Sequence, residues 1–232
     1  GSDPARQRRR PRSRGARRAE WSARAPRSTW PPTVPRVEPV AKKIFLGVGT
    51  GSAANAFNAA VGSATPIGDG TGAALTMDST GTTLFNSTVE TASGITQTVG
   101  ANDVTFRENV TVTGGDTDST FNEDVVLDGM TYATDGSLTF GDSGLDQVTL
   151  STSDVTLDVT GANLTVNSKV DGARDLFING SAANTFNAAV GGTTPIGDAT
   201  GAALTINSTG ATTFNNTLTS RSGIHQDNAA GA

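Results

Sequence analysis

The stretch GSAANAFNAAVGSATPIGDGTGAALTMDSTGTTLFN, residues 51–86, returns as GSAANTFNAAVGGTTPIGDATGAALTINSTGATTFN at residues 180–215. The likeness extends without a gap over residues 51–97 and 180–226, where 33 of the 47 aligned positions are identical. Self-similarity at a fixed spacing is the signature of array architectures, in which one structural unit is built again further along the chain. The sequence therefore predicts a repeat protein.

Charge divides the chain into two parts of opposite character. The stretch 1–43 carries 13 of the 17 basic residues against three acids, whereas the stretch 44–232 carries four basic residues against 19 acids. The first part alternates Arg and Pro without an apolar period, so we expect a disordered basic leader or linker there. The second part is rich in Gly, Thr, Asn and Ala, which favours short strands and tight turns over amphipathic helices.

Two short motifs recur beyond residue 43. In the first, Phe is followed by Asn or Arg, two further residues, and then Val or Leu; it predicts a strand that ends at Phe, a polar corner and a new strand. In the second, Thr stands between two apolar residues, so that two side chains point inward and one outward. The Phe motif occurs at residues 57–61, 85–89, 106–110, 121–125, 186–190 and 214–218, and the Thr motif at 75–77, 104–106, 110–112, 138–140, 148–150, 155–157, 164–166 and 204–206.

A parallel β-solenoid satisfies both motifs. Each short strand pairs with its equivalent in the next coil, and the inward apolar residues stack along one axis. Residues 44–232 are expected to form this body, with two or three strands per coil, about 20 residues per coil and roughly nine coils. The Asn residues after Phe are expected to form ladders at the corners, where Asn tolerates left-handed turns and hydrogen-bonds neighbouring backbone.

The phrases TFNAAVGGTTPIGDATGAALTINSTGATTFNNTLT and VTFRENVTVTGG resemble the repeats of very large bacterial surface proteins, of the filamentous haemagglutinin and autotransporter adhesin type. The resemblance covers about residues 45–226 and concerns the shaft alone. It implies an all-β fold, a right-handed parallel β-helix, with export to the cell surface and a role in adhesion or biofilm. We expect a fragment of a longer array, located extracellularly or at the cell surface.

Catalytic chemistry has little support in this sequence. His225 is the single histidine and stands where the first copy has Thr96, so no Ser–His–Asp arrangement can recur with the repeat. Arg107 and Glu108 are the nearest mixture of acid and base, and they lie inside one Phe motif, where Arg107 takes the corner position of Asn. We predict no enzyme activity, no catalytic residue and no cofactor.

Four acids, Asp116, Asp118, Glu123 and Asp124, lie close together in sequence around a Gly-Gly turn. Calcium prefers several flexible oxygen ligands of this kind. The spacing fits neither an EF-hand nor the glycine and aspartate nonapeptide of calcium-binding β-rolls, so the prediction is that no metal site is present and that these acids are solvated at a corner.

Three functions from different classes remain. The first is the structural shaft of an adhesin or extracellular filament, with end-to-end self-association through uncapped coils and with surface glycans or proteins as partners. The second is a carbohydrate-binding or carbohydrate-processing β-helix. The third is an ice-binding solenoid, against which the Thr motifs count because their spacing along the chain is irregular. Neither nucleic acid binding by the body nor a membrane span is expected, since no run of about 18 apolar residues exists.

Overall fold

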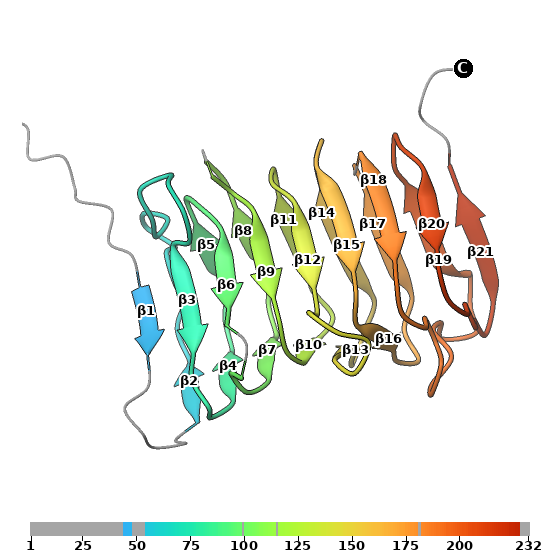
Figure 1. The fold of residues 1–232 in the computed structure, drawn as a ribbon, viewed down its shortest axis with the longest axis horizontal. Coiled ribbons are helices and arrows are strands. Elements are labelled where there is room, and N and C mark those ends of the chain that lie inside the picture. Colours follow the sequence, from blue (N-terminus) through green and yellow to red (C-terminus); the bar gives the residue numbers. More distant parts are fainter. Residues whose placement is uncertain (1–43, 48–53, 99, 115, 181, 228–232) are drawn as a thin grey trace, which may run out of the picture. The chain divides into compact units, whose positions relative to one another are not determined.

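The computed structural model describes residues 44–47, 54–98, 100–114, 116–180 and 182–227. In this part the chain is all-β, without a helix, and winds into a parallel β-solenoid of about seven turns (Figure 1). The predicted fold class is thereby confirmed. The leader predicted for residues 1–43 lies outside the described residues, and the first described strand begins at Ile44.

Three parallel sheets form the three faces of the solenoid, and the chain visits them in the order A, B, C. Face A consists of β1 (Ile44–Gly47), β3 (Leu75–Asp78), β6 (Ile95–Gln97), β9 (Ser119–Phe121), β12 (Leu138–Phe140), β15 (Asn163–Val166), β18 (Ala183–Phe186) and β20 (Thr212–Phe214). Face B consists of β2 (Asn55–Phe57), β4 (Thr83–Phe85), β7 (Val104–Phe106), β10 (Val125–Leu127), β13 (Gln147–Leu150) and β16 (Lys169–Asp171). Face C consists of β5 (Val89–Thr91), β8 (Val110–Val112), β11 (Thr131–Thr134), β14 (Val155–Val159), β17 (Leu176–Asn179), β19 (Ala202–Asn207) and β21 (Gly223–Gln226).

The strands are short because each crosses only one face before the chain turns. Most three-residue strands bury their first and third side chains and leave the second half-exposed, as in Val104–Phe106 and Val110–Val112. Side chains alternate across a strand, so each coil contributes about two core residues per face. Stacking the coils joins these residues into one apolar column from Leu75 to Ile206.

The number of coils is lower than predicted. Successive face A strands are separated by unequal lengths of chain: the step from Thr120 to Thr139 is the shortest between paired residues, and the step from Phe45 to Thr76 is the longest. The prediction of nine coils assumed a short coil of uniform length, whereas the wide corner loops of each copy lengthen the coil without adding a rung. About seven turns therefore use the whole body.

The Phe motif is confirmed as a strand end, a corner and a new strand. Phe85 ends β4 and Val89 begins β5, and the same relation joins Phe106 to Val110. The phenyl rings stack in columns: Phe57, Phe85 and Phe106 lie in parallel on face B, with ring centroids 4.9 and 5.1 Å apart. On face A, Phe121 stacks on Phe140, and Phe186 on Phe214. Parallel stacking follows from the register, because equivalent rings lie one rung apart.

The two copies of the long repeat lie on different faces of the solenoid. β2 of the first copy is on face B, whereas its equivalent in the second copy, β18, is on face A. In the same way β3 on face A corresponds to β19 on face C, and β4 on face B to β20 on face A. The repeat therefore spans five full turns and two further faces. A surface position in the second copy points one face away from its equivalent in the first.

Candidate functional site

Seven of the eight strands of face A carry a threonine at the outward central position, and in the remaining strand, β1, the residue paired with Thr76 is Phe45. The pairing register aligns these residues in an unbroken line along the sheet, and Figure 1 shows their strands side by side. The side chains are half-exposed or exposed, while the residues on either side point into the core. We call this line the threonine row; it comprises Thr76, Thr96, Thr120, Thr139, Thr165, Thr185 and Thr213.

The other two faces have mixed residues at the corresponding positions. Face B has Ala56, Leu84, Thr105, Val126, Thr149 and Asp171 in register. Face C has two such rows in register: one consists of Glu90, Thr111, Ala133, Asp158, Asn179 and Asn207, and the other of Thr131, Thr156, Phe177, Thr205 and His225. The uniform row is therefore a property of one face and not of the solenoid as a whole.

Differences between the two repeat copies follow the face on which each residue lies. At four pairs of equivalent positions, the residue at the centre of the strand lies on face A in one copy and on another face in the other copy. Three of these four differ, and in each the residue on face A is the threonine. The pairs are Ala56 with Thr185, Leu84 with Thr213, and Thr96 with His225, while Thr76 and Thr205 agree.

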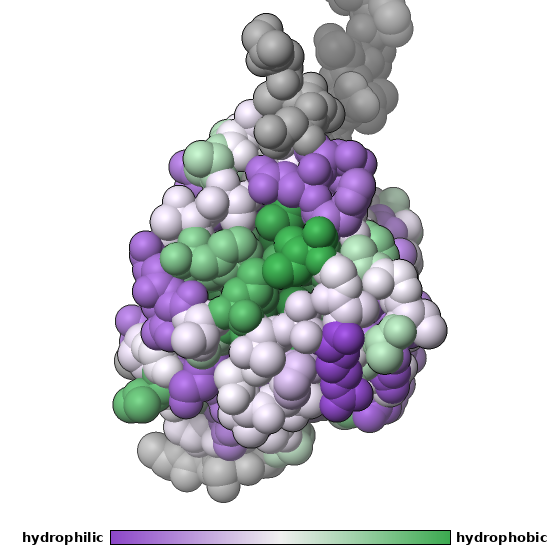
Figure 2. All heavy atoms as spheres, turned by 90° about the vertical axis from the view of Figure 1, so that its right-hand side faces the viewer, coloured by the Kyte–Doolittle hydropathy of each residue, from purple (hydrophilic) through white to green (hydrophobic). Residues whose placement is uncertain are grey.

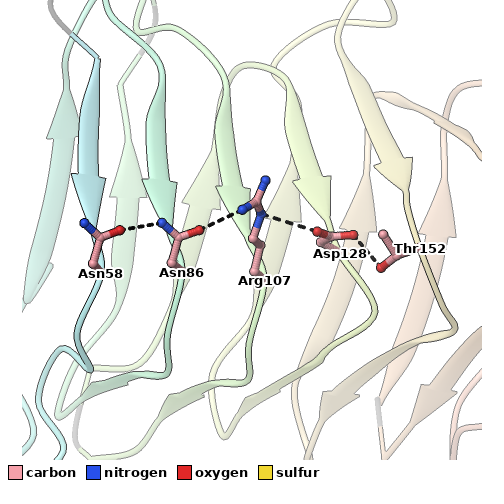
Figure 3. A network of polar contacts seen from close by, with 5 residues as sticks. All are labelled: Asn58, Asn86, Arg107, Asp128 and Thr152. Carbon is pink, nitrogen blue, oxygen red and sulfur yellow. Dashed lines mark hydrogen bonds and ion pairs between the residues drawn. The ribbon is translucent and has the colours of Figure 1, made fainter.

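A polar ladder runs along the corner that follows face B (Figure 3). Asn86 donates from Nδ2 to Oδ1 of Asn58 at 2.7 Å, and Arg107 donates from Nη1 to Oδ1 of Asn86 at 2.9 Å. The Nε atom of Arg107 lies 3.5 Å from Oδ2 of Asp128, whose other oxygen accepts the hydroxyl of Thr152. Arg107 therefore occupies the Asn rung, as predicted, and its charge is compensated within the ladder.

A second ladder follows face A at its C-terminal corners. Asn215 donates to Asn187 at 2.7 Å, and Asn187 donates to Asn167 at 2.8 Å. These Asn residues do not adopt the left-handed turns that Asn tolerates: among described residues other than Gly, only Thr152 and Ala199 have a positive φ. Hydrogen bonds between equivalent side chains, not backbone conformation, account for Asn at these corners.

The four acids predicted to lie at one corner are divided between two. Asp116 and Asp118 precede β9, whereas Glu123 and Asp124 follow it. Each carboxylate accepts a backbone N–H from a different segment: Asp116 from Gly72, Asp118 from Ser137, Glu123 from Gly100 and Asp124 from Gln147. Their role in this structure is to hold neighbouring coils and loops, and they do not converge on one point.

A different group of acids converges at the corner between faces B and C. Asp154, Asp175 and Asp198 come from three successive coils, and one carboxylate oxygen of each lies within 4.8 Å of the others. Because these acids are separated by one coil of chain, they do not stand out as a cluster in the sequence. Asp154 accepts the backbone N–H of Asp175 at 3.1 Å, and Asp175 accepts that of Asp198 at 3.2 Å. These bonds give the group a structural role in joining coils.

The carboxylates of this acidic group differ in their protonation equilibria. Burial raises the pKa of Asp175, and the neighbouring charges of Asp154 and Asp198 raise it further, against the hydrogen bond from the Asp198 backbone. The hydroxyl and backbone N–H of Thr200 both donate to Asp198 at 2.7 Å and hold its pKa below the ordinary value. Ionisation is therefore less favourable for Asp175 than for Asp198.

The remaining residues singled out in the sequence lie at separate places in the fold. His225 lies on the outer side of β21, and its Nε2 atom is 3.0 Å from Oδ1 of Asp227. Glu108 is exposed and follows Arg107 at a corner, where the Arg107 guanidinium contacts Asp128.

The end of the solenoid that carries β20 and β21 exposes part of the core. Figure 2 shows hydrophobic side chains gathered at the centre of this end, with polar residues around them. Phe214 and Leu218 pack against the core but are only partly buried, and Ile224 is 51 % exposed. We call Phe214, Leu218 and Ile224 the end face.

The described residues contain no helix long and apolar enough to cross a membrane. No family model, curated protein or solved structure matches the chain.

Proposed function

We propose that this chain forms part of a structural shaft, in a bacterial surface adhesin or another extracellular filament, and that its coils stack end to end. The parallel β-solenoid is compatible with such a shaft, and the sequence resemblance to adhesin repeats supports the surface role. Stacked coils extend the apolar core and the hydrogen-bonded sheets along one axis. A long molecule can be built in this way because each coil contacts only the coils next to it.

The end face is the observation that carries this proposal. Its residues in the second copy correspond to Phe85, Val89 and Ile95 in the first. There the next coil covers them: Phe85 stacks on Phe106 at 5.1 Å, and none of the three is more than 1 % exposed. The same surface is thus a covered coil-to-coil interface in one copy and an open one in the other.

The first coil of a second molecule presents faces A, B and C in the same order as the coil at the end face. That coil passes through β1 on face A, β2 on face B, and the bridging residues Val61 and Ile67 on face C. The end face presents β20 on face A, Leu218 on face B and β21 on face C. Parallel pairing therefore places like faces on like faces. Unpaired strand edges and apolar side chains both favour such addition.

Sedimentation velocity over a range of concentrations tests the stacking. The chain is expected to form oligomers that grow with concentration, and Ile224→Glu is expected to keep it monomeric because it places a charge in the apolar contact. Leu145→Glu is the matched control, since Leu145 is 85 % exposed away from the end face and gains the same charge. A wild-type chain that stays monomeric, or equal loss of association in both variants, would contradict end-to-end stacking.

The surface role needs a separate test. Protease added to intact source cells is expected to cleave the parent protein, while a cytoplasmic marker stays whole. Protection of the parent protein in intact cells would contradict the proposed extracellular filament, and only the fold would remain supported.

A further inference from the structure

We propose that the threonine row on face A is an ice-binding surface. This inference goes beyond the structural shaft and does not depend on end-to-end stacking. Its partner is crystalline water: a neutral, periodic solid that a regular row of hydroxyl and methyl groups can match along its length.

The row is regular and stiff. Parallel strands lie about 4.8 Å apart, so the seven threonines form a line with one fixed repeat. Each stands between inward-pointing residues that fix its backbone, and the β-branched side chain has few rotamers. The irregular sequence gaps, which counted against such a face, are absorbed by the corners. A rigid row binds an ordered partner without losing much conformational freedom on binding.

The hydroxyl groups of the row remain available to a partner. None of the seven threonines hydrogen-bonds through its side chain to another described residue. By contrast, Thr98, Thr152 and Thr200 at the corners use their hydroxyls within the protein. Each free hydroxyl offers one donor and two acceptor positions to water.

The surface beside the threonine row carries little charge, which favours a neutral partner. Two residues after each threonine, at or just past the end of the strand, lies a second row, which contains Asp78, Thr98, Asn122, Gly141, Asn167, Asn187 and Asn215. Six of these seven residues are uncharged, although the body carries 19 acids against four bases. Thr-x-Asn thus recurs at Thr120, Thr165, Thr185 and Thr213. Charged macromolecules are recognised by opposite charges, which this surface lacks.

The exchange of residues between the repeat copies is the second, independent observation. If threonine in strands reflected composition or strand propensity alone, it would recur at equivalent positions of both copies. Instead threonine replaces Ala56 and Leu84 when their equivalents turn onto face A, and Thr96 gives way to His225 when its equivalent turns away. At three of the four positions threonine therefore follows the direction in which the surface points, and at the fourth Thr76 and Thr205 agree. That pattern is expected when one whole face meets one flat partner.

Thermal hysteresis and ice recrystallisation measured on the whole chain test the proposal. Three variants from a single coil serve as a matched set: Thr139→Tyr on face A, Thr149→Tyr on face B and Thr156→Tyr on face C. The wild-type chain is expected to lower the freezing point below the melting point of ice. Thr139→Tyr is expected to lose this effect, because a ring in mid-row holds the flat surface away from the crystal, and the other two are expected to retain it. Circular dichroism melts show that all three are folded.

Two outcomes would overturn the ice-binding assignment. One is a wild-type chain without thermal hysteresis or recrystallisation inhibition, and the other is equal loss in all three variants. If the wild-type chain is inactive and Thr139→Tyr alone abolishes a concentration-dependent dimer, the row is an interface between two copies of this chain. Ile224→Glu separates such a dimer from end-to-end stacking, because it leaves face A unchanged.

Discussion

Gly70 and Ala199 occupy the same place in the two copies of the repeat and adopt the same left-handed backbone conformation, with φ of 78° and 76°. Each follows an aspartate whose carboxylate accepts the backbone N–H and the hydroxyl of a threonine two residues later: Asp69 with Thr71, and Asp198 with Thr200. The wide loop thus has the same aspartate–threonine turn at two different corners of the solenoid. In the second copy it tolerates a Cβ where the first has none.

This relationship predicts opposite effects for reciprocal substitutions. A left-handed conformation costs a residue with a side chain roughly 1–2 kcal/mol, partly offset by the greater flexibility of unfolded Gly. Ala199→Gly is therefore expected to stabilise the chain by about 0.5–1 kcal/mol, and Gly70→Ala to destabilise it by a similar amount. Thermal melts of both variants measure this. Destabilisation by Ala199→Gly would mean that the Ala199 methyl group makes contacts worth more than the backbone strain.

Gly94 and Gly223 form a second equivalent pair with different surroundings. A Cβ at Gly94 would lie 1.8 Å from the backbone oxygen of Asp118 in the next coil, whereas nothing lies within 4 Å of one at Gly223. Gly94→Ala is expected to cost about 3 kcal/mol because the coils must separate, and Gly223→Ala to change stability by less than about 0.5 kcal/mol. Melts of dilute, monomeric samples compare the two. Equal effects would show that coil contact does not explain the glycine.

The core of the fold could be predicted from the sequence because its signals are local. The alternation in Val104-Thr105-Phe106 specifies which side chains point inward, and the corner after Phe85 specifies where a strand ends. The face on which each strand lies could not be predicted in this way. The face depends on how many residues all the preceding corner loops contain. A few extra residues in a loop, such as those near Gly70 or Ala199, therefore change the face on which every later sequence position falls.

The surface groupings were hidden for the same reason. The chain between Thr185 and Thr213 is much longer than that between Thr120 and Thr139, yet both pairs are direct neighbours in register. The acids Asp154 and Asp175 meet at one corner across a whole coil, whereas acids close in sequence, such as those before and after β9, lie at different corners. In a solenoid, neighbours on the surface are one coil apart. A signal was present, since Asp154 and Asp175 each directly precede the first apolar residue of a strand.

Tyr132 places a hydroxyl in the core beside Ser119, but no hydrogen bond of ordinary geometry joins it to a described residue. Its ring makes edge contacts with Phe106 and Phe121, with centroids 6.4 and 5.9 Å away. Tyr132→Phe keeps these contacts and removes the unpaired hydroxyl, so stabilisation by about 1 kcal/mol is expected. Phe140→Tyr, which adds a buried hydroxyl, is the reverse control and should destabilise. A clear loss of stability in Tyr132→Phe would show that the hydroxyl is paired, for instance with a buried water.

Asp175 and Asp198 are expected to give opposite pH dependence, although they belong to one acidic group. The folded-state pKa of Asp175 is raised from 3.8 by burial and by the nearby charges, so its ionisation opposes folding. Its contribution to stability is greatest below the unfolded-state pKa and is lost as the pH rises through the folded-state pKa. Asp175→Asn retains an oxygen for the Asp198 N–H and is expected to stabilise the chain at pH 7. This advantage should shrink as the pH falls through the same range.

For Asp198 the sign is reversed. Its folded-state pKa is lowered from 3.8 by the two hydrogen bonds from Thr200, so the ionised carboxylate supports folding above the unfolded-state pKa. Asp198→Asn is therefore expected to destabilise the chain at pH 7, with a difference that disappears as the pH falls through the folded-state pKa. Melting temperatures of both variants from pH 3 to 7 compare the two aspartates, using the ordinary carboxyl range as reference. Parallel profiles would mean that the charge of the group as a whole, rather than the burial of Asp175 and the Thr200 bonds to Asp198, governs stability at this corner.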